Sequence, residues 1–177
     1  MTDTATDTRR LGRGFILTAW IALLILLTLL AQYGLNDAHN PNRHLTVTPG
    51  ADGLREVKLV RNRYGHYLTP GEINGRPALF MLDTGATEVV IPAALETTLG
   101  LTRGRPSQAR TANGAITVYR TTLDTLRIGP LTLHNVRASL NPNMRANDEI
   151  LLGMSALKHL ELIARDGLLT LRQPAAR

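Results

Sequence analysis

The chain contains no cysteine among its 177 residues, which excludes a disulfide scaffold, thiol catalysis and cysteine-ligated zinc. Aromatic residues make up only 4% of it, and lysine and arginine occur without forming a basic run after the N-terminal region. Nucleic-acid binding surfaces combine clustered basic residues with interleaved aromatic ones. The net charge of +6 therefore predicts a solvated basic surface and no nucleic-acid partner.

Several motifs of enzyme sites are also missing. The sequence has no glycine-rich phosphate loop, and neither Ser139 nor Ser155 lies in a Gly-x-Ser-x-Gly context. His66, His134 and His159 are too far apart in the sequence to indicate a metal site. We therefore expect neither a metal ion nor a cofactor.

The apolar residues are unevenly spread. Residues 14–35 carry no charged side chain, and Arg9, Arg10 and Arg13 precede them. A helix of that length reaches roughly 33 Å, enough to cross the hydrocarbon core of a membrane. The sequence thus predicts one transmembrane helix over residues 14–35.

A cleaved signal peptide is the alternative for this segment. Signal peptides have shorter apolar runs, of about 7–15 residues, and end in a small-x-small cleavage site, which Leu-Leu-Ala-Gln-Tyr at 29–33 fits poorly. The first basic residue after the run is Arg43, so the positive-inside rule favours an N-terminus in the cytoplasm. We expect residues 1–13 to form a cytoplasmic tail of an inner-membrane protein whose folded domain lies in the periplasm.

The remainder divides into a linker and a folded domain. Residues 36–55 are polar and rich in turn signals, which predicts a linker, and residues 56–177 form the domain. Two short helices are expected at 92–99 and 154–160. Strand-like runs, separated by Asn-Gly, Gly-Pro and Asp-Gly turns, cover residues 56–61, 66–73, 78–82, 116–123, 126–128, 131–140 and 168–171. This pattern predicts a mainly β, mainly antiparallel domain.

The most informative segment runs from Phe80 to Thr87, where a hydrophobic strand leads directly into Asp83, Thr84 and Gly85. Such a sequence delivers a carboxylate to the end of a buried strand. Threonine can brace the loop through its hydroxyl group, and glycine lets the backbone approach a neighbour closely. An ordinary strand-to-loop turn is the alternative, so the neighbouring segments decide between the two.

Those segments occur in a characteristic order. Asp-Thr-Gly-Ala-Thr at 83–87 is followed by Ala-Asn-Gly at 112–114 and by Leu-Leu-Gly-Met at 151–154. This arrangement resembles the retropepsin-like aspartic proteases, specifically the bacterial type with a single membrane span. The resemblance covers about residues 64–171 and implies a closed antiparallel β domain with one or two short helices.

The resemblance also implies roles for individual residues. Asp83 would be the catalytic carboxylate, Thr84 would brace the site across a dimer, and Gly85 and Ala86 would complete the active-site loop. The flap over an extended peptide would include Asn113, Gly114 and Ile116. Structural support behind the loop would come from Leu151, Leu152 and Gly153.

Aspartic proteases use two carboxylates about 3 Å apart that share a proton. This chain has a single Asp-Thr-Gly, so the resemblance implies a homodimer with one Asp83 from each copy. One departure concerns the dimer brace, because Thr87 and Met154 occupy positions where retroviral members carry Asp and Arg. The expected brace therefore differs from the retroviral one.

The leading hypothesis is a membrane-anchored aspartic endopeptidase that acts on extended polypeptide as a homodimer. The alternative is a non-catalytic adaptor of the same fold that binds extended segments of envelope proteins. Autoprocessing within residues 36–55 is a further open possibility. The sequence leaves the substrate and the pH optimum open.

Overall fold

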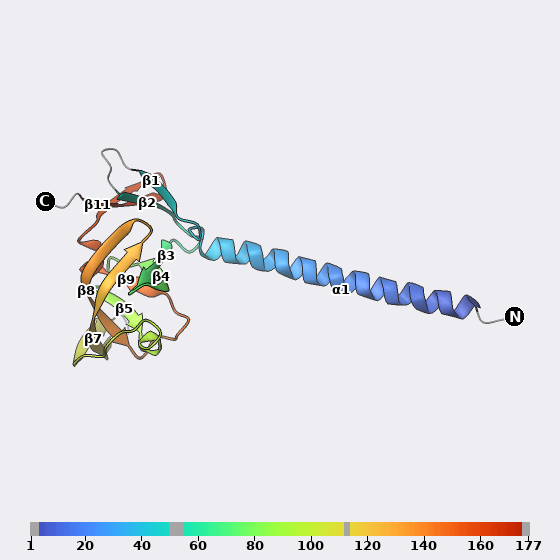
Figure 1. The fold of residues 1–177 in the computed structure, drawn as a ribbon, viewed down its shortest axis with the longest axis horizontal. Helices are drawn as coiled ribbons and strands as arrows, with labels where there is room; N and C mark the ends of the chain where they lie inside the picture. The colour runs from blue at the N-terminus through green and yellow to red at the C-terminus, as the bar shows by residue number, and fades with distance from the viewer. Residues whose placement is uncertain (1–3, 50–54, 112–113, 175–177) are drawn as a thin grey trace. The chain divides into compact units, whose positions relative to one another are not determined.

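The computed structural model describes residues 4–49, 55–111 and 114–174, and the chain separates into two compact units, Met1–His39 and Asn40–Arg177 (Figure 1). The first unit contains helix α1 (Thr4–His39). Its described apolar side chains are exposed, as at Phe15, which is 78% exposed. Residues 14–35 are thus helical, as expected.

The predicted membrane span has a separate outcome. Within the described residues, no helix has the length and apolarity that a membrane crossing requires. The structure therefore does not confirm a transmembrane helix at residues 14–35.

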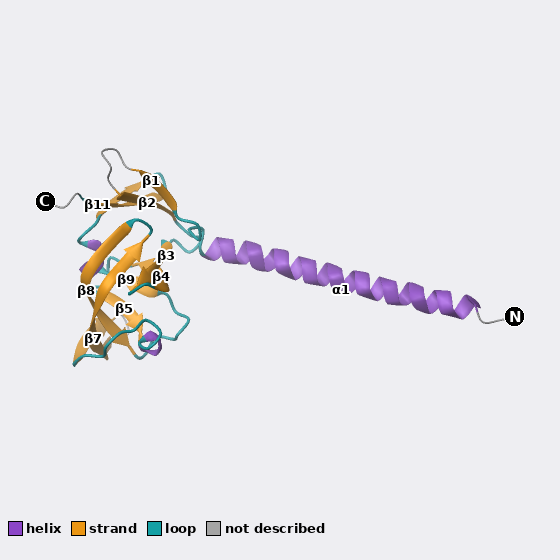
Figure 2. Cartoon of the chain, in the orientation of Figure 1, coloured by secondary structure: helices purple, strands orange, loops and turns teal. Residues whose placement is uncertain are grey.

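The second unit is built almost entirely of strands (Figure 2). Its elements are β1 (Thr46–Pro49), β2 (Arg55–Val60), β3 (Leu68–Ile73), β4 (Arg76–Leu82), β5 (Val89–Pro92), the 3-10 helix η2 (Ala93–Leu95), β6 (Pro106–Thr111), β7 (Gly114–Ile128), β8 (Leu131–Asn141), β9 (Ile150–Leu152), α2 (Met154–Leu157), β10 (Glu161–Arg165) and β11 (Leu168–Gln173). They form a seven-stranded sheet in the order β3-β4-β9-β5-β8-β7-β6 and a four-stranded sheet in the order β1-β2-β11-β10.

The larger sheet closes into a barrel because β3 pairs with β7 as well as with β4. Gly71 in β3 permits this closure. A Cβ atom there would overlap the carbonyl oxygen of Arg127 in β7 and would lie 2.7 Å from the ring of Phe80 in β4. The absent side chain thus lets three strands meet, and the expected closed β domain is confirmed.

Two strand pairings differ from the expected antiparallel arrangement. β4 runs parallel to β9, with Leu82 opposite Leu152, and β5 runs parallel to β8, with Val90 opposite Ser139. Long connections separate the members of each pair in the sequence, which is what a parallel pairing requires. Hairpin signals report on sequence neighbours only, so they could not reveal these pairs.

The turn chemistry agrees with the sequence at two hairpins. Asn74 and Gly75, between β3 and β4, have φ values of 51° and 73°, and Asp166 and Gly167, between β10 and β11, have 51° and 77°. Two successive residues with positive φ are the signature of the hairpin turn that Asn-Gly and Asp-Gly favour. These turns fix the register of both hairpins.

The barrel interior is filled by aliphatic side chains and one aromatic ring. Phe80, Ile91, Leu123 and Leu140 are fully buried, and they belong to the same hydrophobic cluster as Leu152. Each comes from a different strand of the closed sheet. The core therefore immobilises the ends of β4 and β5, between which the loop that carries Asp83 extends, and the end of β9 beside them.

Several elements depart from the expected boundaries. The segment 36–55, expected as a linker, contains the end of α1 and strand β1, and the compact unit begins at Asn40 rather than at Glu56. Strands β5, β6, β9 and β10 were not expected, and the two expected helices are shorter, at Ala93–Leu95 and Met154–Leu157. β1 forms a strand because it pairs with β2. Its own sequence does not indicate a strand.

Candidate active site

The loop that carries Asp83 begins where β4 ends beside β9. The Asp83 backbone N–H donates a hydrogen bond to the Leu152 carbonyl at 3.2 Å, which continues the parallel pairing by one residue. The Asp83 carboxylate in turn accepts a hydrogen bond from the Gly85 backbone N–H at 2.8 Å. The side chain is partly exposed, so backbone contacts orient this carboxylate while it stays accessible.

Gly153 holds the loop from behind. A Cβ atom at this position would lie 2.6 Å from the Ala86 carbonyl oxygen and would overlap the Glu88 carbonyl oxygen as well. The neighbouring Met154 backbone N–H donates a hydrogen bond to the Ala86 carbonyl at 2.8 Å. Residue 153 must therefore be glycine because the neighbouring backbone atoms leave no space for a side chain. Its backbone conformation is not the reason, since a φ of −91° suits any residue.

Ser155 ties the same loop to β8. Its buried Oγ accepts a hydrogen bond from the Val89 backbone N–H at 3.0 Å and donates one to the Arg137 carbonyl at 2.7 Å. No sequence motif pointed to this serine, because its partners are brought together only by the crossing of α2 over β5 and β8.

Asp83 lines a pocket of about 640 Å³. One wall comes from the loop and strands beneath it, and the other from the β6–β7 hairpin. The lining residues are Asp83, Gly85, Ala86, Thr87, Glu88, Val90, Gln108, Ala109, Arg110, Thr111, Ile116, Val118, Ser139, Asn141 and Leu151. The structure thus brings the loop that carries Asp83 and the expected flap residue Ile116 into the lining of one cavity.

The β6–β7 hairpin is fastened at its base. The Gly104 backbone N–H donates to the Arg120 carbonyl at 2.7 Å, and the Thr121 hydroxyl donates to the Thr102 carbonyl at 2.9 Å. Towards the tip, most residues of both strands are exposed, and Gly114 has a φ of 112°. Asn113, expected at the tip, lies outside the described residues.

The pocket has a polar side. Glu88 lines it from the active-site loop and Arg110 lines it from the hairpin, which places one charge of each sign in the cavity besides that of Asp83. Ser139 is only 2% exposed, and its hydroxyl makes no hydrogen bond to the described part of the chain. Its position in the lining leaves this hydroxyl available to a bound molecule.

The other expected site residues lie around the pocket in three ways. Leu151 lines it, while Leu152 and Gly153 are buried behind the loop. Thr84 is exposed and does not belong to the lining. Thr87 and Met154, where the retroviral pattern has charged residues, are also exposed.

Sequence reasoning missed much of the lining. Val90 lines the pocket because β5 runs beside β9 and β8. The run Val-Val-Ile at 89–91 is typical of a β-strand, but only the helix that begins at Pro92 was predicted. Gln108 and Arg110 belong to β6, whose strand character depends on its pairing with β7. No local pattern indicated that strand.

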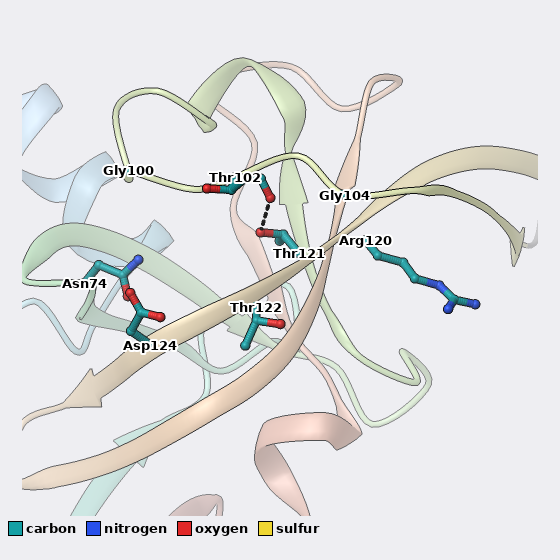
Figure 3. Close-up of a pocket in the computed structure, with 8 residues that line it drawn as sticks. All are labelled: Asn74, Gly100, Thr102, Gly104, Arg120, Thr121, Thr122 and Asp124. Atoms are coloured by element: carbon teal, nitrogen blue, oxygen red, sulfur yellow. Dashed lines mark hydrogen bonds between the residues drawn. The ribbon is translucent and has the colours of Figure 1, made fainter.

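A second pocket, of about 420 Å³, lies beside β7 (Figure 3). Its lining is polar: Asn74, Gly100, Thr102, Gly104, Arg120, Thr121, Thr122 and Asp124. Two of these residues, Thr121 and Thr102, are joined by a hydrogen bond. None of the expected site residues lines it, and within residues 4–49, 55–111 and 114–174 no three His, Asp or Glu side chains could together hold a metal ion.

Comparison with known proteins decides the family. The model of the family described as "gag-polyprotein putative aspartyl protease" matches residues 69–159, which include the Asp83 loop, the hairpin and Gly153. The chain belongs to the retropepsin-like aspartic proteases. The matched segment spans strands β3 to β9 and helix α2, and it contains every residue that lines the pocket at Asp83.

Individual proteins are similar to the chain in sequence or in structure. A retropepsin-like aspartic protease from Rickettsia conorii has a crystal structure similar to this retropepsin-like chain, with 27% identity and a TM-score of 0.57 over 73% of this chain and 95% of that one. The structure of the EIAV protease in complex with the inhibitor HBY-793 has 24% identity and a TM-score of 0.43, over 55% of this chain and 89% of that one. An uncharacterised protein of Sinorhizobium sp, from the cobV 5′ region, is 29% identical over 121 residues; the match covers 67% of this chain and only 52% of that relative.

Proposed function

We propose that this retropepsin-like chain is an aspartic endopeptidase whose active site forms between two copies, each contributing Asp83. The observation that carries the proposal is the position of the Asp83 carboxylate, which accepts a hydrogen bond from the Gly85 N–H and belongs to the lining of a pocket. A hairpin forms the opposite wall of that pocket. This arrangement suits an extended peptide bound between a fixed carboxylate and a closing flap.

The need for a second copy follows from chemistry. Hydrolysis by an aspartic dyad requires two adjacent carboxylates, one ionised and one protonated. The chain has one Asp-Thr-Gly. Thr84 is exposed beside Asp83, which leaves it accessible to a symmetry-related loop.

The reaction then proceeds without a cofactor. A water oxygen attacks the carbonyl carbon of the scissile peptide while the ionised Asp83 carboxylate accepts one water proton and the protonated one donates its proton to the carbonyl oxygen. The tetrahedral diol collapses as the C–N bond breaks: the protonated Asp83 carboxyl gives its proton to the nitrogen, and the ionised one accepts a proton from a diol hydroxyl. The products are a free carboxyl group and a free amino group, and the dyad regains its single shared proton.

The test is cleavage of an unfolded protein substrate by the full chain and by Asp83→Asn. We expect the substitution to lower the rate at least a thousandfold, because the amide cannot accept the water proton. Asp124→Asn, in the second pocket, is the matched control and should keep the full rate. Thermal melts of both variants show whether either has lost its fold.

Cleavage by Asp83→Asn at the rate of the native chain would refute the assignment. Absence of cleavage by the native chain, combined with binding of extended peptides, would instead favour the adaptor of the same fold. A pepstatin-type inhibitor separates these outcomes, because only a working dyad binds a mimic of the tetrahedral intermediate tightly.

We further propose that residues 14–35 anchor the protein in the inner membrane, with residues 1–13 in the cytoplasm and the protease unit in the periplasm. The support is the absence of charge over these residues, the helical conformation of α1 and the exposure of its described apolar side chains. The protein should stay in the membrane pellet after alkaline carbonate extraction. Externally added protease should degrade the β unit in spheroplasts, and recovery of the intact chain in the soluble fraction would exclude the anchor.

A further inference from the structure

The four-stranded sheet packs against the barrel with only one of its faces. Val57 and Leu59 in β2 are buried, and they belong to the same hydrophobic cluster as the barrel interior. Alternate residues of a strand point to opposite faces of the sheet. Lys58 and Val60, which are exposed, therefore point away from the barrel, and Leu168 of β11 lies beside Val60 on the same side. We call this side of the sheet the outer face.

The outer face is apolar and basic over two rows of side chains that cross the sheet. These rows contain Val60, Leu168, Arg165, Lys58, Thr170 and Ile163. None of the six is acidic, and Val60, Leu168 and Ile163 are 45%, 40% and 40% exposed. Exposed apolar side chains that gather beside one another, with polar groups around them, are typical of an interaction surface.

The third row of the outer face is different, because its charges neutralise one another. Arg172 lies between two carboxylates and donates to Glu56 at 2.5 Å and to Glu161 at 3.4 Å. Lys58 and Arg165, in the first two rows, are exposed and form no ion pair with the described part of the chain. The outer face thus has an ion-paired end and an end that is apolar and positively charged.

The loop between β2 and β3 continues the apolar and basic end. Its residues Arg61, Arg63 and Tyr64 are exposed. At 56%, Tyr64 is the most exposed large hydrophobic side chain in the described part of the second unit. The Arg63 guanidinium lies 4.6 Å from the centre of the Tyr64 ring. Tyrosine beside a cation is typical of a membrane–water interface, where the ring lies at the level of the headgroups and the cation is attracted to anionic lipids.

The chain that arrives from α1 joins the second unit at this same end of the sheet. The buried Asn42 side chain accepts a hydrogen bond from the Val60 N–H at 2.7 Å and donates to the Val60 and Leu68 carbonyls at 2.9 Å and 2.7 Å. Only residues 36–41 separate Asn42 from the proposed membrane span, and even a fully extended chain bridges no more than about 25 Å there. The headgroup layer beyond the hydrocarbon core is about 5–7 Å thick. The apolar and basic end therefore stays close to the membrane surface.

We propose that the outer face and the β2–β3 loop dock on the surface of the membrane that holds α1, by binding anionic lipid headgroups. Lys58, Arg61 and Arg63 contact the lipid phosphates, and the Tyr64 ring enters the headgroup layer. This inference rests on the proposed membrane anchor. Docking leaves the pocket at Asp83 uncovered, because none of the residues that line it belongs to the four-stranded sheet. The membrane thus orients the protease unit and keeps its pocket open to polypeptide.

A fluorescent label on the outer face tests the docking, because the native chain has no cysteine. The full chain with Leu168→Cys is labelled with NBD, which emits more strongly in a drier environment, and is reconstituted into vesicles. Emission should be about twofold or more higher with phosphatidylethanolamine and about 30% phosphatidylglycerol than with phosphatidylcholine alone. The difference should disappear in 1 M NaCl, where charges interact over only about 3 Å. The same label at Thr122→Cys, exposed on β7, is the control and should not respond to the lipid.

A charge reversal separates docking from any affinity of the label for lipid. Lys58→Glu combined with Arg63→Glu should abolish the increase that phosphatidylglycerol causes. Arg120→Glu combined with Arg137→Glu, both exposed in the larger sheet, gives the same change in net charge and should keep the increase. Thermal melts check that both variants are folded. An increase that survives the first pair of substitutions, or that both pairs abolish equally, would overturn the proposal.

The outcomes distinguish docking from the anchor and from a protein partner. If carbonate extraction releases the chain but the Leu168→Cys label responds to added phosphatidylglycerol vesicles, the docking stands and the anchor fails. If the chain is anchored and the label ignores the lipid composition, the anchor stands and the docking fails. Emission that rises with protein density in phosphatidylcholine vesicles would show that a second copy covers the face, which also refutes lipid docking. None of these readouts depends on catalysis.

Discussion

The two walls of the pocket at Asp83 are built in opposite ways. The loop wall is fixed by backbone hydrogen bonds to β9 and α2, by the two bonds of Ser155 and by close packing against Gly153. The hairpin wall is clamped at its base, near Gly104 and Thr121, and its strands are mostly exposed beyond that base. One wall has many structural partners and the other has few.

This difference separates stability from activity. Substitutions in a wall fixed by buried contacts change the free energy of unfolding, because they leave overlaps or unsatisfied polar groups. Substitutions in a wall held mainly by its own hairpin change substrate binding instead, since such segments belong to the least stable parts of a fold. Variants of either wall test whether stability and activity separate in this way.

The largest effect is expected for Gly153→Ala. The new methyl group would overlap the backbone oxygens of Glu88 and Ala86, neither of which can move without displacing the Asp83 loop. We expect a loss of about 3 kcal/mol or more in the free energy of unfolding, measured by urea denaturation. Gly167→Ala, in a hairpin turn with nothing near its Cβ position, should cost only about 1–2 kcal/mol because of its positive φ. Equal losses of unfolding free energy for Gly153→Ala and Gly167→Ala would show that the Asp83 loop moves to accommodate the methyl group.

Two buried serines give the next comparison. Ser155→Ala removes the acceptor of the Val89 N–H and the donor to the Arg137 carbonyl. It should destabilise the fold by about 1–3 kcal/mol in thermal or urea unfolding, because buried backbone groups lose their partners. Ser139→Ala should leave stability nearly unchanged, since its hydroxyl makes no hydrogen bond to the described residues.

The two serine variants should also differ in kinetics. Ser139 lines the pocket, so its alanine variant should raise KM for peptides that hydrogen-bond to this hydroxyl while the melting temperature stays the same. A stability loss for Ser139→Ala as large as that for Ser155→Ala would contradict the assignment of the two hydroxyls.

The smallest effect on stability is expected in the hairpin. Ile116→Ala removes a half-buried side chain that lines the pocket from β7. It should lower kcat/KM about tenfold through lost apolar contact with the substrate, and it should change the unfolding free energy by less than about 1 kcal/mol. Ile91→Ala, fully buried in β5, is the contrasting control and should cost about 2–5 kcal/mol.

Much of the fold could be predicted from local patterns. The hairpin turns at Asn74-Gly75 and Asp166-Gly167 occur where their residue types indicated, and strands β2, β3, β4, β8 and β11 follow the expected runs with small shifts at their ends. Two strand-like runs were expected between residues 116 and 128, but strand β7 is continuous from Gly114 to Ile128. It is continuous because its pairing with β8 continues on both sides of residue 124, at Leu123 and at Thr125.

The site was predictable only in part. Asp83 and Ile116 were indicated by the motif order, and they meet at one pocket. Ser155, Ser139 and Arg110 lie in unremarkable sequence contexts, and their roles depend on what the fold places beside them. The parallel pairs β4–β9 and β5–β8 explain this failure, because no short-range signal encodes a partner that lies far along the chain.

The sequence alone determined the family, through one Asp-Thr-Gly after a hydrophobic strand and a glycine at 153, and it indicated Asp83 as the candidate catalytic residue. The lack of cysteine excluded thiol chemistry. Only the tertiary structure decided which wall of the pocket is fixed, which hydroxyl has no partner and which face of the smaller sheet stays exposed. The physical reason is that motifs reflect local backbone and side-chain chemistry. Burial, hydrogen-bond satisfaction and exposed apolar faces are properties of segments that meet only after folding.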